Sequence, residues 1–266
     1  MKRREFLKTS VAASAAAISH SAISARGADQ PGGAGREVYE LRAYRLKEGA
    51  NHDLLDAYLE KAFVPGLNRL GVKSVGVFAE QEPKDGEKVW VLVPYASMES
   101  FSATGTKLAK DEAYLKAGAG YLTSPKEKPG FDRIDSWLLL AFSGLPKIEL
   151  PAYSRERKPR IFELRTYESH SEAKALRKIE MFNSGEIEVM REVGLGPVFY
   201  GQALIGRDLP HLTYMLSAED REAHKKHWGG FGAHPTWKKM KDDPQYADTV
   251  SKITSRFLAP ASYSQI

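Results

Sequence analysis

The chain has 266 residues, of which 42% are hydrophobic and 27% charged, and it contains no cysteine. This globular composition argues against a disordered, collagen-like or coiled-coil protein. The absence of cysteine excludes disulfides, thiolate metal sites and cysteine nucleophiles. The formal net charge is +5, but residues 1–25 hold four basic residues and one acidic residue, so the rest of the chain carries only about +2. We therefore predict no nucleic-acid partner, since such a partner normally requires a concentrated basic face.

The N-terminus resembles a twin-arginine export signal. Arg3-Arg4 is followed by Glu-Phe-Leu-Lys and then by a stretch of small apolar residues at 11–25, which is too short for a membrane anchor. We predict a cleaved signal peptide over residues 1–25, a flexible lead over 26–36, and a periplasmic or secreted protein with no stable membrane anchor after cleavage. The alternative is an amphipathic tail with a chance arginine pair.

The rest of the chain contains one sequence unit twice. Residues 38–44 (VYELRAY) return as residues 161–167 (IFELRTY), and further matches follow in the same order, such as 71–78 with 194–200. We interpret this series as an internal duplication. The first repeat is predicted at residues 37–143, a Pro-rich linker at 144–159, and the second repeat at 160–266.

The hydrophobic periodicity predicts the same order of elements in both repeats. In the first repeat the expected elements are a strand at 37–45, a helix at 50–70, strands at 73–81 and 87–94, a helical region at 97–118 and a strand at 134–142. In the second repeat they are a strand at 160–168, a helix at 171–193, strands at 197–205 and 211–217, a helical region at 218–242 and a strand at 253–258. Gly71 and Gly194 are expected to end the first helices, and Ser97 and Ser217 are candidate N-caps of the second ones.

The order β-α-β-β-α-β predicts an α+β fold of two tandem ferredoxin-like domains. Each sheet would carry its helices on one face and need a cover on the other. Two such sheets on one chain are expected to pair face to face as an intrachain pseudo-dimer that resembles a dimeric α/β-barrel. Exposed sheet edges would also permit homo-oligomers.

The second repeat resembles the NIPSNAP family, at Phe162-Glu163-Leu164-Arg165-Thr166-Tyr167 and again in the aromatic segment 228–238. The resemblance covers about residues 160–263, and residues 37–142 fit it more loosely. It implies a dimeric α/β-barrel fold. It implies no settled reaction, since that family offers no agreed catalytic residues to carry over.

The repeated Glu-Leu-Arg-x-Tyr strand carries charged residues on one face and apolar residues on the other. We expect Leu41 and Leu164 to face the helices and the charged face to point between the sheets. The candidate residues of a ligand pocket there are Glu40, Arg42, Tyr44, Glu163, Arg165, Tyr167, Tyr200, Gln202 and Tyr214. One hypothesis is a pocket for an anionic or hydroxylated small molecule. The other is a structural ion pair in each repeat.

Histidines gather in the second repeat, where His224 and His227 have helical i, i+3 spacing and His234 follows seven residues later. Three imidazoles could bind zinc, copper or iron. However, no acidic residue completes a known metal spacing and two lysines flank the pair, so a metal site is the less favoured interpretation. A lone histidine as a haem ligand is a further alternative, and no cofactor is predicted. Trp228, Phe231 and Trp237 are interpreted as packing anchors, with a mobile lid as the alternative.

No dinucleotide fingerprint, phosphate loop or nucleophile elbow occurs in the chain. The predicted function is therefore that of an exported NIPSNAP-like α/β-barrel protein that binds a small molecule in the cavity between its sheets or acts as an assembly module. The alternative is a cofactor-independent enzyme of the monooxygenase or isomerase type. A haem- or metal-binding enzyme is less favoured, and catalytic residues are not identified.

Overall fold

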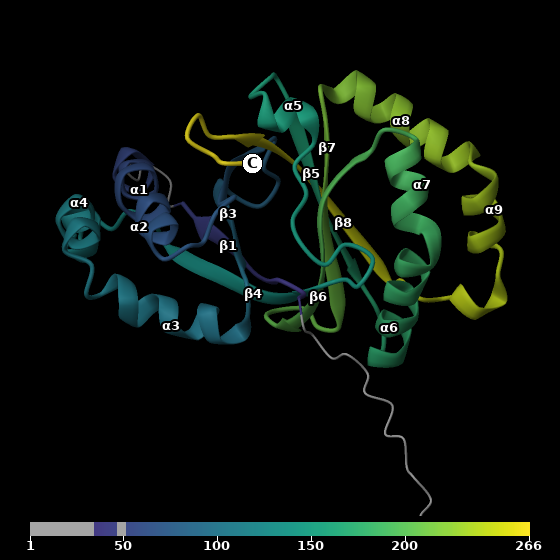
Figure 1. The fold of residues 1–266 in the computed structure, drawn as a ribbon, viewed down its shortest axis with the longest axis horizontal. Helices are drawn as coiled ribbons and strands as arrows, with labels where there is room; N and C mark the ends of the chain where they lie inside the picture. Colours follow the sequence, from purple (N-terminus) through teal and green to yellow (C-terminus); the bar gives the residue numbers. More distant parts are fainter. Residues whose placement is uncertain (1–34, 47–51) are drawn as a thin grey trace, which may run out of the picture. The chain divides into compact units, whose positions relative to one another are not determined.

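Eight antiparallel strands form a closed barrel in the computed structural model, which describes residues 35–46 and 52–266. The order around the barrel is β1-β3-β2-β8-β5-β7-β6-β4, and the chain path can be followed in Figure 1. The signal peptide predicted over residues 1–25 and most of the lead predicted over 26–36 lie outside the described residues.

Each repeat contributes four neighbouring strands and a group of helices. The first repeat contains β1 (Val38–Arg45), α1 (His52–Tyr58), the π-helical turn η1 (Leu59–Phe63), α2 (Val64–Arg69), β2 (Gly76–Gln81), β3 (Lys88–Tyr95), α3 (Met98–Leu108), α4 (Glu112–Leu122) and β4 (Arg133–Ala141). After α5 (Ala152–Arg155), the second contains β5 (Ile161–Glu168), α6 (Glu172–Met181), η2 (Phe182–Glu186), α7 (Ile187–Glu192), β6 (Gly196–Ile205), β7 (His211–Ala218), α8 (Arg221–Ala233), α9 (Pro235–Lys241), the 3₁₀ turn η3 (Pro244–Tyr246) and β8 (Lys252–Pro260). The prediction of two tandem ferredoxin-like units is confirmed.

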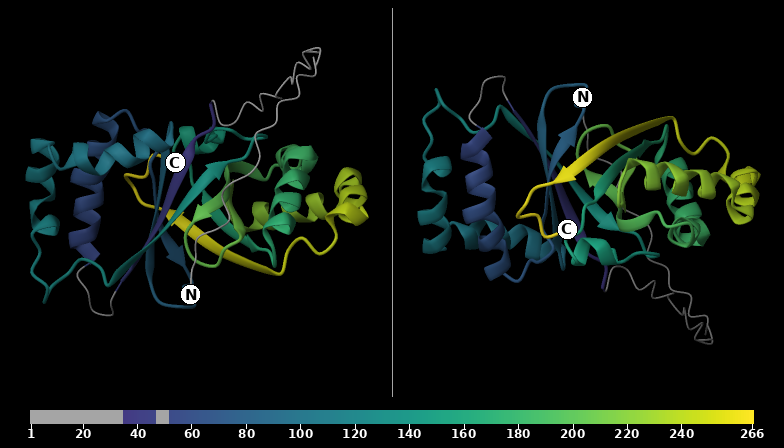
Figure 2. Two further views of the ribbon diagram at one scale, coloured as in Figure 1. Left: turned by 90° about the horizontal axis from the view of Figure 1, so that it is seen from below. Right: turned by 90° about the horizontal axis from the view of Figure 1, so that it is seen from above.

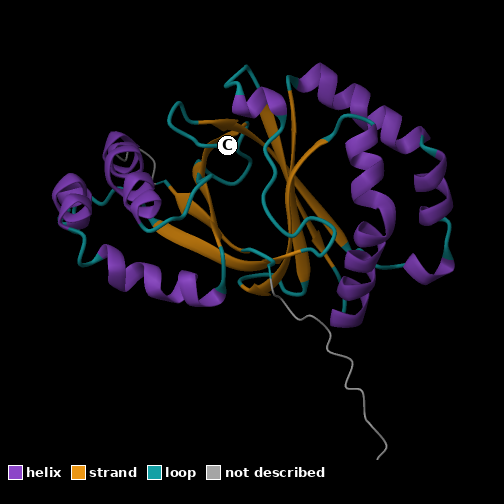
Figure 3. Cartoon of the chain, viewed as in Figure 1, coloured by secondary structure: helices purple, strands orange, loops and turns teal. Residues whose placement is uncertain are grey.

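The two four-stranded sheets join at both edges, and their helices lie on opposite flanks of the barrel (Figures 2 and 3). β2 pairs with β8, where Phe78 lies opposite Pro260, and β4 pairs with β6, where Leu139 lies opposite Ala203. The predicted intrachain pseudo-dimer is therefore a closed barrel. Because every described strand has two neighbours, the argument for homo-oligomers from exposed sheet edges is wrong. Oligomerisation itself stays a prediction.

The middle of the barrel is filled by aromatic rings. Tyr39 meets Phe199 with ring centroids 5.1 Å apart, and Phe78 meets Phe162 at 5.0 Å. All four side chains are fully buried, and both pairs have the edge-to-face geometry that aromatic rings favour. Of these rings, Tyr39 and Phe162 share a strand face with Leu41 and Leu164, the face that was expected to meet the helices.

The predicted orientation of the Glu-Leu-Arg-x-Tyr strands was therefore wrong. Leu41 and Leu164 belong to the core inside the barrel, whereas Tyr44 packs with the helices of the first repeat and Glu163 contacts α8 through Trp228. Two physical reasons account for this orientation: the width of the barrel centre and the position of the hydrogen-bond donors. The narrow barrel centre accommodates only close-packed apolar rings, while the charged side chains find hydrogen-bond donors beneath the helices.

One end of the barrel is closed by the connector between the repeats and by the C-terminus. Ile148 and Leu150 of the connector pack against the barrel core, as does Ile266, which is fully buried. The Glu149 amide donates to the carbonyl of Val198, near the start of β6. The opposite end of the barrel is the one that remains open.

The helix ends follow the sequence in most places. Gly71 and Gly194 adopt φ values of +86° and +88° after the first helices, as a glycine stop requires. Ser97 caps α3 by accepting from the Ser100 amide. The expectation for Ser217 was wrong, because Asp220 caps α8. The sequence also gave no sign of the turns η1 and η2.

Candidate functional site

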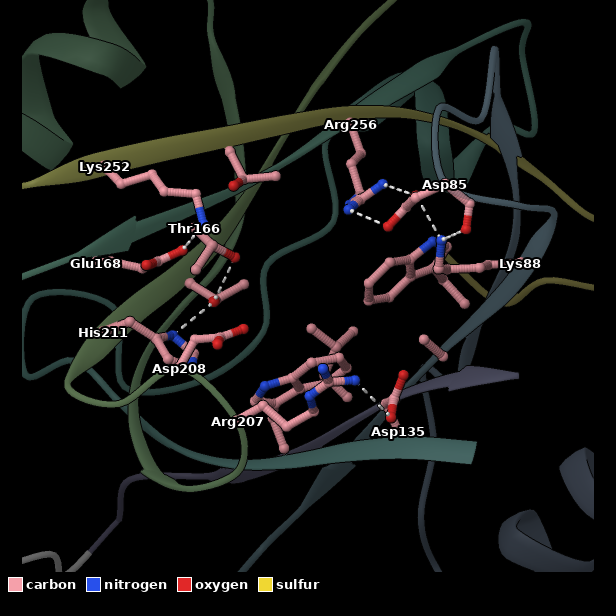
Figure 4. Close-up of a pocket in the computed structure, with 16 residues that line it drawn as sticks. Asp85, Lys88, Asp135, Thr166, Glu168, Arg207, Asp208, His211, Lys252 and Arg256 are labelled. Carbon is pink, nitrogen blue, oxygen red and sulfur yellow. Dashed lines mark hydrogen bonds and ion pairs between the residues drawn. The ribbon is translucent and has the colours of Figure 1, made fainter. Parts of the chain in front are cut away.

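A cavity of about 270 Å³ occupies the open end of the barrel, where β1 and β5 end and β3, β4, β7 and β8 begin. Figure 4 shows its lining, which comes from both repeats. We call this cavity the barrel mouth. It is lined by Leu41, Ala43, Asp85, Lys88, Trp90, Asp135, Trp137, Thr166, Glu168, Arg207, Asp208, His211, Thr213, Lys252, Thr254 and Arg256.

Two stacked tryptophans form the side of the mouth that belongs to the first repeat, and we call them the tryptophan wall. The rings of Trp90 and Trp137 lie 5.9 Å apart at an interplanar angle of 19°. Trp90 Nε1 donates to the Glu80 carboxylate at 3.1 Å, which fixes that ring. The backbone of Gly206 packs closely against the other ring, since a Cβ atom added at this position would lie only 2.2 Å from Trp137 Cδ1. The wall is therefore held in place from two sides.

Three threonines on adjacent strands form the opposite side, and we call them the threonine row. Thr166 of β5 lies opposite Thr213 of β7 and opposite Thr254 of β8. The hydroxyls of Thr166 and Thr213 are 2.9 Å apart. Counted from the repeated strand, the first repeat has Trp90 where the second has Thr213. The duplication has therefore produced a mouth with two chemically different sides.

Eight charged residues surround the mouth, and they balance in sign. The acidic residues are Asp85, Asp135, Glu168 and Asp208, and the basic residues are Lys88, Arg207, Lys252 and Arg256. Hydrogen bonds from Lys88 lower the pKa of Asp85 to about 2, despite its partial burial, with a further contribution from Arg256. Its carboxylate lies 2.6 Å from Lys88 Nζ and 3.1 Å from Arg256 Nη1.

Further ion pairs neutralise most of the remaining charge. Lys252 lies 2.7 Å from Glu168, and Arg207 lies 3.3 Å from Asp135. Figure 4 shows these pairs around the cavity, with His211 and the Lys252–Glu168 pair on one side and Asp85, Lys88 and Arg256 on the other. Because the pairs cancel, the mouth has no strong preference for a highly charged ligand.

His211 is the buried histidine of the mouth, with 3% of its surface exposed. Its Nδ1 lies 3.3 Å from the Thr213 hydroxyl, and its Nε2 is buried without a hydrogen-bond partner. Burial lowers the pKa of His211, against the raising effect of nearby backbone groups and of the Glu168 and Asp208 carboxylates. The ring is therefore neutral at neutral pH.

None of the nine residues predicted to line an inter-sheet pocket lines the barrel mouth. These residues are Glu40, Arg42, Tyr44, Glu163, Arg165, Tyr167, Tyr200, Gln202 and Tyr214, and strand alternation places them on the helix-facing side of the barrel. The sequence pattern grouped them correctly on common faces but assigned those faces to the wrong side. The reason is that an outer face covered by helices is as well shielded as the interior.

Glu163 is the centre of a buried polar network beneath α8. Its carboxylate lies 2.5 Å from Arg165 and 2.8 Å from His224 Nε2, accepts from Trp228 Nε1 at 3.0 Å, and also accepts from Ser255. Burial alone would raise the pKa of Glu163, but the hydrogen bond from His224 and the charge of Arg165 lower it to about 2.

The first repeat has the same kind of network. Glu40 pairs with Arg42 at 2.7 Å and accepts from Tyr95 and Ser136, each at 3.2 Å. Ser136 and Ser255 occupy the same place relative to the repeated strand, opposite the arginine of each repeat. In both networks the buried carboxylate pairs with an arginine and accepts further hydrogen bonds, as a structural ion pair requires, although Arg165 Nε and His224 Nδ1 are buried without a hydrogen-bond partner.

The second repeat also buries an ion pair that the sequence did not reveal. Lys178 Nζ lies 2.7 Å from Glu186, and both side chains are at most 5% exposed. The ammonium group also lies 4.7 Å from the Phe182 ring and 5.4 Å from the Trp237 ring. Glu186 ends the π-helical turn η2, so the pair fixes that turn against α6.

The three histidines considered as metal ligands have separate roles. His224 contacts Glu163, the ring of His227 lies against Gly194, and His234 caps α9 and lies 3.1 Å from Glu192. No group of three or more side chains suited to hold a metal ion occurs within residues 35–46 and 52–266. In the same ranges, no helix has the length and apolar character needed to cross a membrane.

Trp228, Phe231 and Trp237 pack as anchors. The Phe231 ring lies 5.3 Å from Trp228 and 4.5 Å from Trp237, and Phe231 belongs to the core between the helices and the sheet. These aromatic residues lie on the helix side of the barrel, and none lines the mouth. The interpretation as packing anchors is confirmed, and the lid alternative has no support.

Sequence reasoning missed the tryptophan wall and the threonine row as a site. Their residues lie on five strands, and none stands in a known motif. A position-by-position comparison of the repeats would have given a signal, because Lys88 and Trp90 in the first repeat correspond to His211 and Thr213 in the second. Such a change between otherwise similar copies marks the positions where the two halves differ in chemistry.

Comparisons with known proteins agree with this architecture. The family model NIPSNAP matches residues 39–142 and 162–265, one match for each repeat. No curated protein matches the chain. A candidate monooxygenase from Fusobacterium nucleatum is 13% identical over 85% of this chain and 93% of its own, with a TM-score of 0.53. One from Lactobacillus acidophilus is 8% identical over 85% and 94%, also with 0.53.

These two structures share the fold of the whole barrel. An uncharacterised NIPSNAP-like domain protein from Burkholderia xenovorans is 23% identical over 40% of this chain and 88% of its own, with a TM-score of 0.36. The two family matches together cover most of the sequence. The chain therefore belongs to the NIPSNAP family.

Proposed function

We propose that the chain binds one small molecule with a planar aromatic ring and a hydroxyl group in the barrel mouth. The observation that carries this proposal is the division of the cavity into a tryptophan wall and a threonine row. A flat apolar ring gains contact area and stacking energy on the tryptophans. A hydroxyl group on the opposite edge finds threonine side chains that both donate and accept hydrogen bonds.

The size and charge of the cavity support a small, weakly charged ligand. A volume of about 270 Å³ lies just below the usual range for small-molecule pockets, which begins at about 300 Å³. The acidic and basic side chains around it pair with one another, as with Asp85 and Lys88 at 2.6 Å. A ligand with several charges would have to break such pairs, whereas a neutral ring leaves them intact.

The proposal can be tested by NMR on the four indole N–H groups of the chain. Trp90 and Trp137 are in the mouth, while Trp228 and Trp237 lie on the helix side and act as internal controls. Titration with 2-naphthol is expected to shift the first two signals and leave the other two in place. Naphthalene, which lacks the hydroxyl, should bind more weakly.

Two results would contradict the proposal. The first is a titration in which 2-naphthol leaves the signals of Trp90 and Trp137 unchanged at millimolar concentration. The second is a shift of these signals with glucose but not with 2-naphthol, because sugars also stack on tryptophan and would then be the preferred class of ligand. If 2-naphthol binds as proposed, a Trp137→Ala variant should bind it more weakly, since the substitution removes one of the two rings of the tryptophan wall.

A second candidate function is an enzyme that moves a proton on such a ligand, as a cofactor-independent isomerase or monooxygenase does. The hydrogen-bonded sequence from Thr166 through Thr213 to His211 favours it. The site of action would be the periplasm or the exterior, because we also propose that the twin arginines of residues 3–4 direct export. That part of the proposal depends on the sequence pattern alone.

A further inference from the structure

A continuous set of hydrogen bonds leads from the wall of the barrel mouth to a buried imidazole. Thr166 Oγ1 lies 2.9 Å from Thr213 Oγ1, which lies 3.3 Å from His211 Nδ1. Figure 4 labels Thr166 and His211, the two ends of this set. All three residues line the mouth. Hydroxyl groups in such a row can pass protons, because each one donates and accepts at the same time.

The surroundings of His211 keep its imidazole neutral before proton transfer and stabilise the imidazolium that forms when the ligand gives up a proton. Burial keeps the ring neutral. The relay uses the tautomer with the proton on Nε2, in which the Nδ1 lone pair accepts from the Thr213 hydroxyl. The charged groups that face the ring are Glu168 of β5, paired with Lys252 of β8, and Arg207 and Asp208 of the β6–β7 turn. The two carboxylates stabilise an imidazolium once it forms, while the paired Lys252 limits that effect.

We propose that Thr166, Thr213 and His211 form a proton relay that accepts the hydroxyl proton of the ligand in the barrel mouth. This inference rests on the proposed function. The ligand O–H bond breaks and its proton moves to Thr166 Oγ1. The Thr166 proton moves to Thr213 Oγ1, and the Thr213 proton forms an N–H bond at His211 Nδ1. The products are a ligand oxyanion and an imidazolium, and no oxidant or reductant takes part.

The relay explains why the second repeat differs from the first at these positions. The first repeat has Ala43 in place of Thr166, Trp90 in place of Thr213 and Lys88 in place of His211. None of these three side chains can continue a hydroxyl relay. A ligand that lies between the two walls is therefore ionised on one side only, which fixes its orientation.

The test uses 4-nitrophenol, whose phenolate form absorbs at a longer wavelength than the neutral form. Absorbance of the bound probe, measured over a pH series, reports binding and ionisation separately. We expect the probe bound to the unaltered protein to ionise at a lower pH than the free probe. Thr213→Val and His211→Gln should abolish this shift, so that the bound probe ionises at or above the pH of the free probe.

Two further variants separate the relay from general effects of substitution. Thr254→Val removes a hydroxyl that no hydrogen bond links to Thr166 in the described structure, so it should weaken binding without changing the pH of ionisation. Thr104→Val lies on α3, where the hydroxyl donates to the Ser100 carbonyl, and it should leave both quantities unchanged. Circular dichroism checks that each variant is folded, and His211→Gln keeps the test valid if Thr213→Val does not fold.

The outcomes distinguish the relay from the proposed function. A bound probe that stays neutral, or one that ionises alike in the unaltered protein, Thr213→Val and His211→Gln, would overturn the relay while leaving the binding site intact. Failure of 4-nitrophenol to bind at all would contradict the proposed function and the relay with it. Ionisation that moves in Thr213→Val and not in Thr254→Val would support the relay.

Discussion

The buried network around Glu163 leads to a quantitative prediction about stability in acid. In the folded protein the pKa of Glu163 is lowered from 4.5 to about 2, because the hydrogen bond from His224 and the charge of Arg165 outweigh the effect of burial. Such a depressed pKa means that the carboxylate stabilises the fold fully above about pH 4.5 and loses this contribution as the pH falls toward 2. At about 1.4 kcal/mol for each pKa unit, the contribution is about 3 kcal/mol.

The perturbation is Glu163→Gln, which keeps the shape of the side chain and removes its charge. It leaves the Arg165 side chain, which is 17% exposed, without its carboxylate partner. We expect the free energy of unfolding at neutral pH to fall by about 3 kcal/mol or somewhat more, since an unpaired buried charge is costly. As the pH drops from 4.5 toward 2, the difference from the unaltered protein should shrink.

The assay is urea unfolding followed by circular dichroism over the acidic and neutral range. Glu188→Gln is the matched control, because its carboxylate pairs with Arg191 at 2.9 Å but is 62% exposed. A surface pair of this kind contributes at most about 1 kcal/mol. If Glu163→Gln destabilises the protein no more than Glu188→Gln, or if its effect does not depend on pH, the reasoning about the buried network is refuted.

Three further predictions follow from other parts of the chain. Lys178→Met should destabilise the protein by about 3–5 kcal/mol, because it leaves Glu186 buried and unpaired. Thermal unfolding measures this loss of stability. A double variant, Lys178→Met with Glu186→Leu, that recovers none of the loss would contradict the prediction. Gly206→Ala should shift the NMR signal of Trp137 and weaken 2-naphthol binding, since the new Cβ atom overlaps that ring; unchanged spectra would count against a tightly held tryptophan wall. Replacement of both arginines at residues 3–4 by lysine should retain the protein in the cytoplasm, and cell fractionation that finds it exported as before would reject the twin-arginine prediction.

Much of the fold could be predicted because the sequence contains the same folding unit twice. The Glu-Leu-Arg-x-Tyr repeat fixed the alignment of the two halves, and the alternation of apolar residues located the strands. In β7, for example, the alternation predicted for residues 211–217 places Leu212 and Tyr214 on one face, and both belong to the same core cluster in the structure. Such periodicity is a local property, so it can be recognised without knowledge of the partner strands.

The direction of each strand face could not be predicted, because it depends on the closure of the barrel. Tyr39 and Glu40 are both buried, so burial alone did not show which one faces the interior. The closed barrel leaves a centre wide enough for packed rings only. The ion pairs then lie under the helices, where Tyr95 and Trp228 donate hydrogen bonds to their carboxylates. This choice is made by tertiary packing and leaves no mark in the local pattern.

The barrel mouth could not be assembled from the sequence for a related reason. Thr166, Thr213 and Thr254 become neighbours only through the strand order β7-β5-β8, and Trp137 reaches Trp90 across β1. None of these residues is unusual in its own segment. The site exists because three-dimensional pairing brings together strand ends that are far apart in the chain.

The central claim is that one hydroxylated aromatic molecule lies between the tryptophan wall and the threonine row. NMR contacts between 2-naphthol and the protein test it most directly, because they report which protons lie close to the bound ring. The account predicts contacts from the ring to the indole of Trp137 and to the methyl groups of Thr166 and Thr254, with one ligand for each chain. Contacts confined to residues outside the mouth, or two equivalent ligands in each chain, would contradict it.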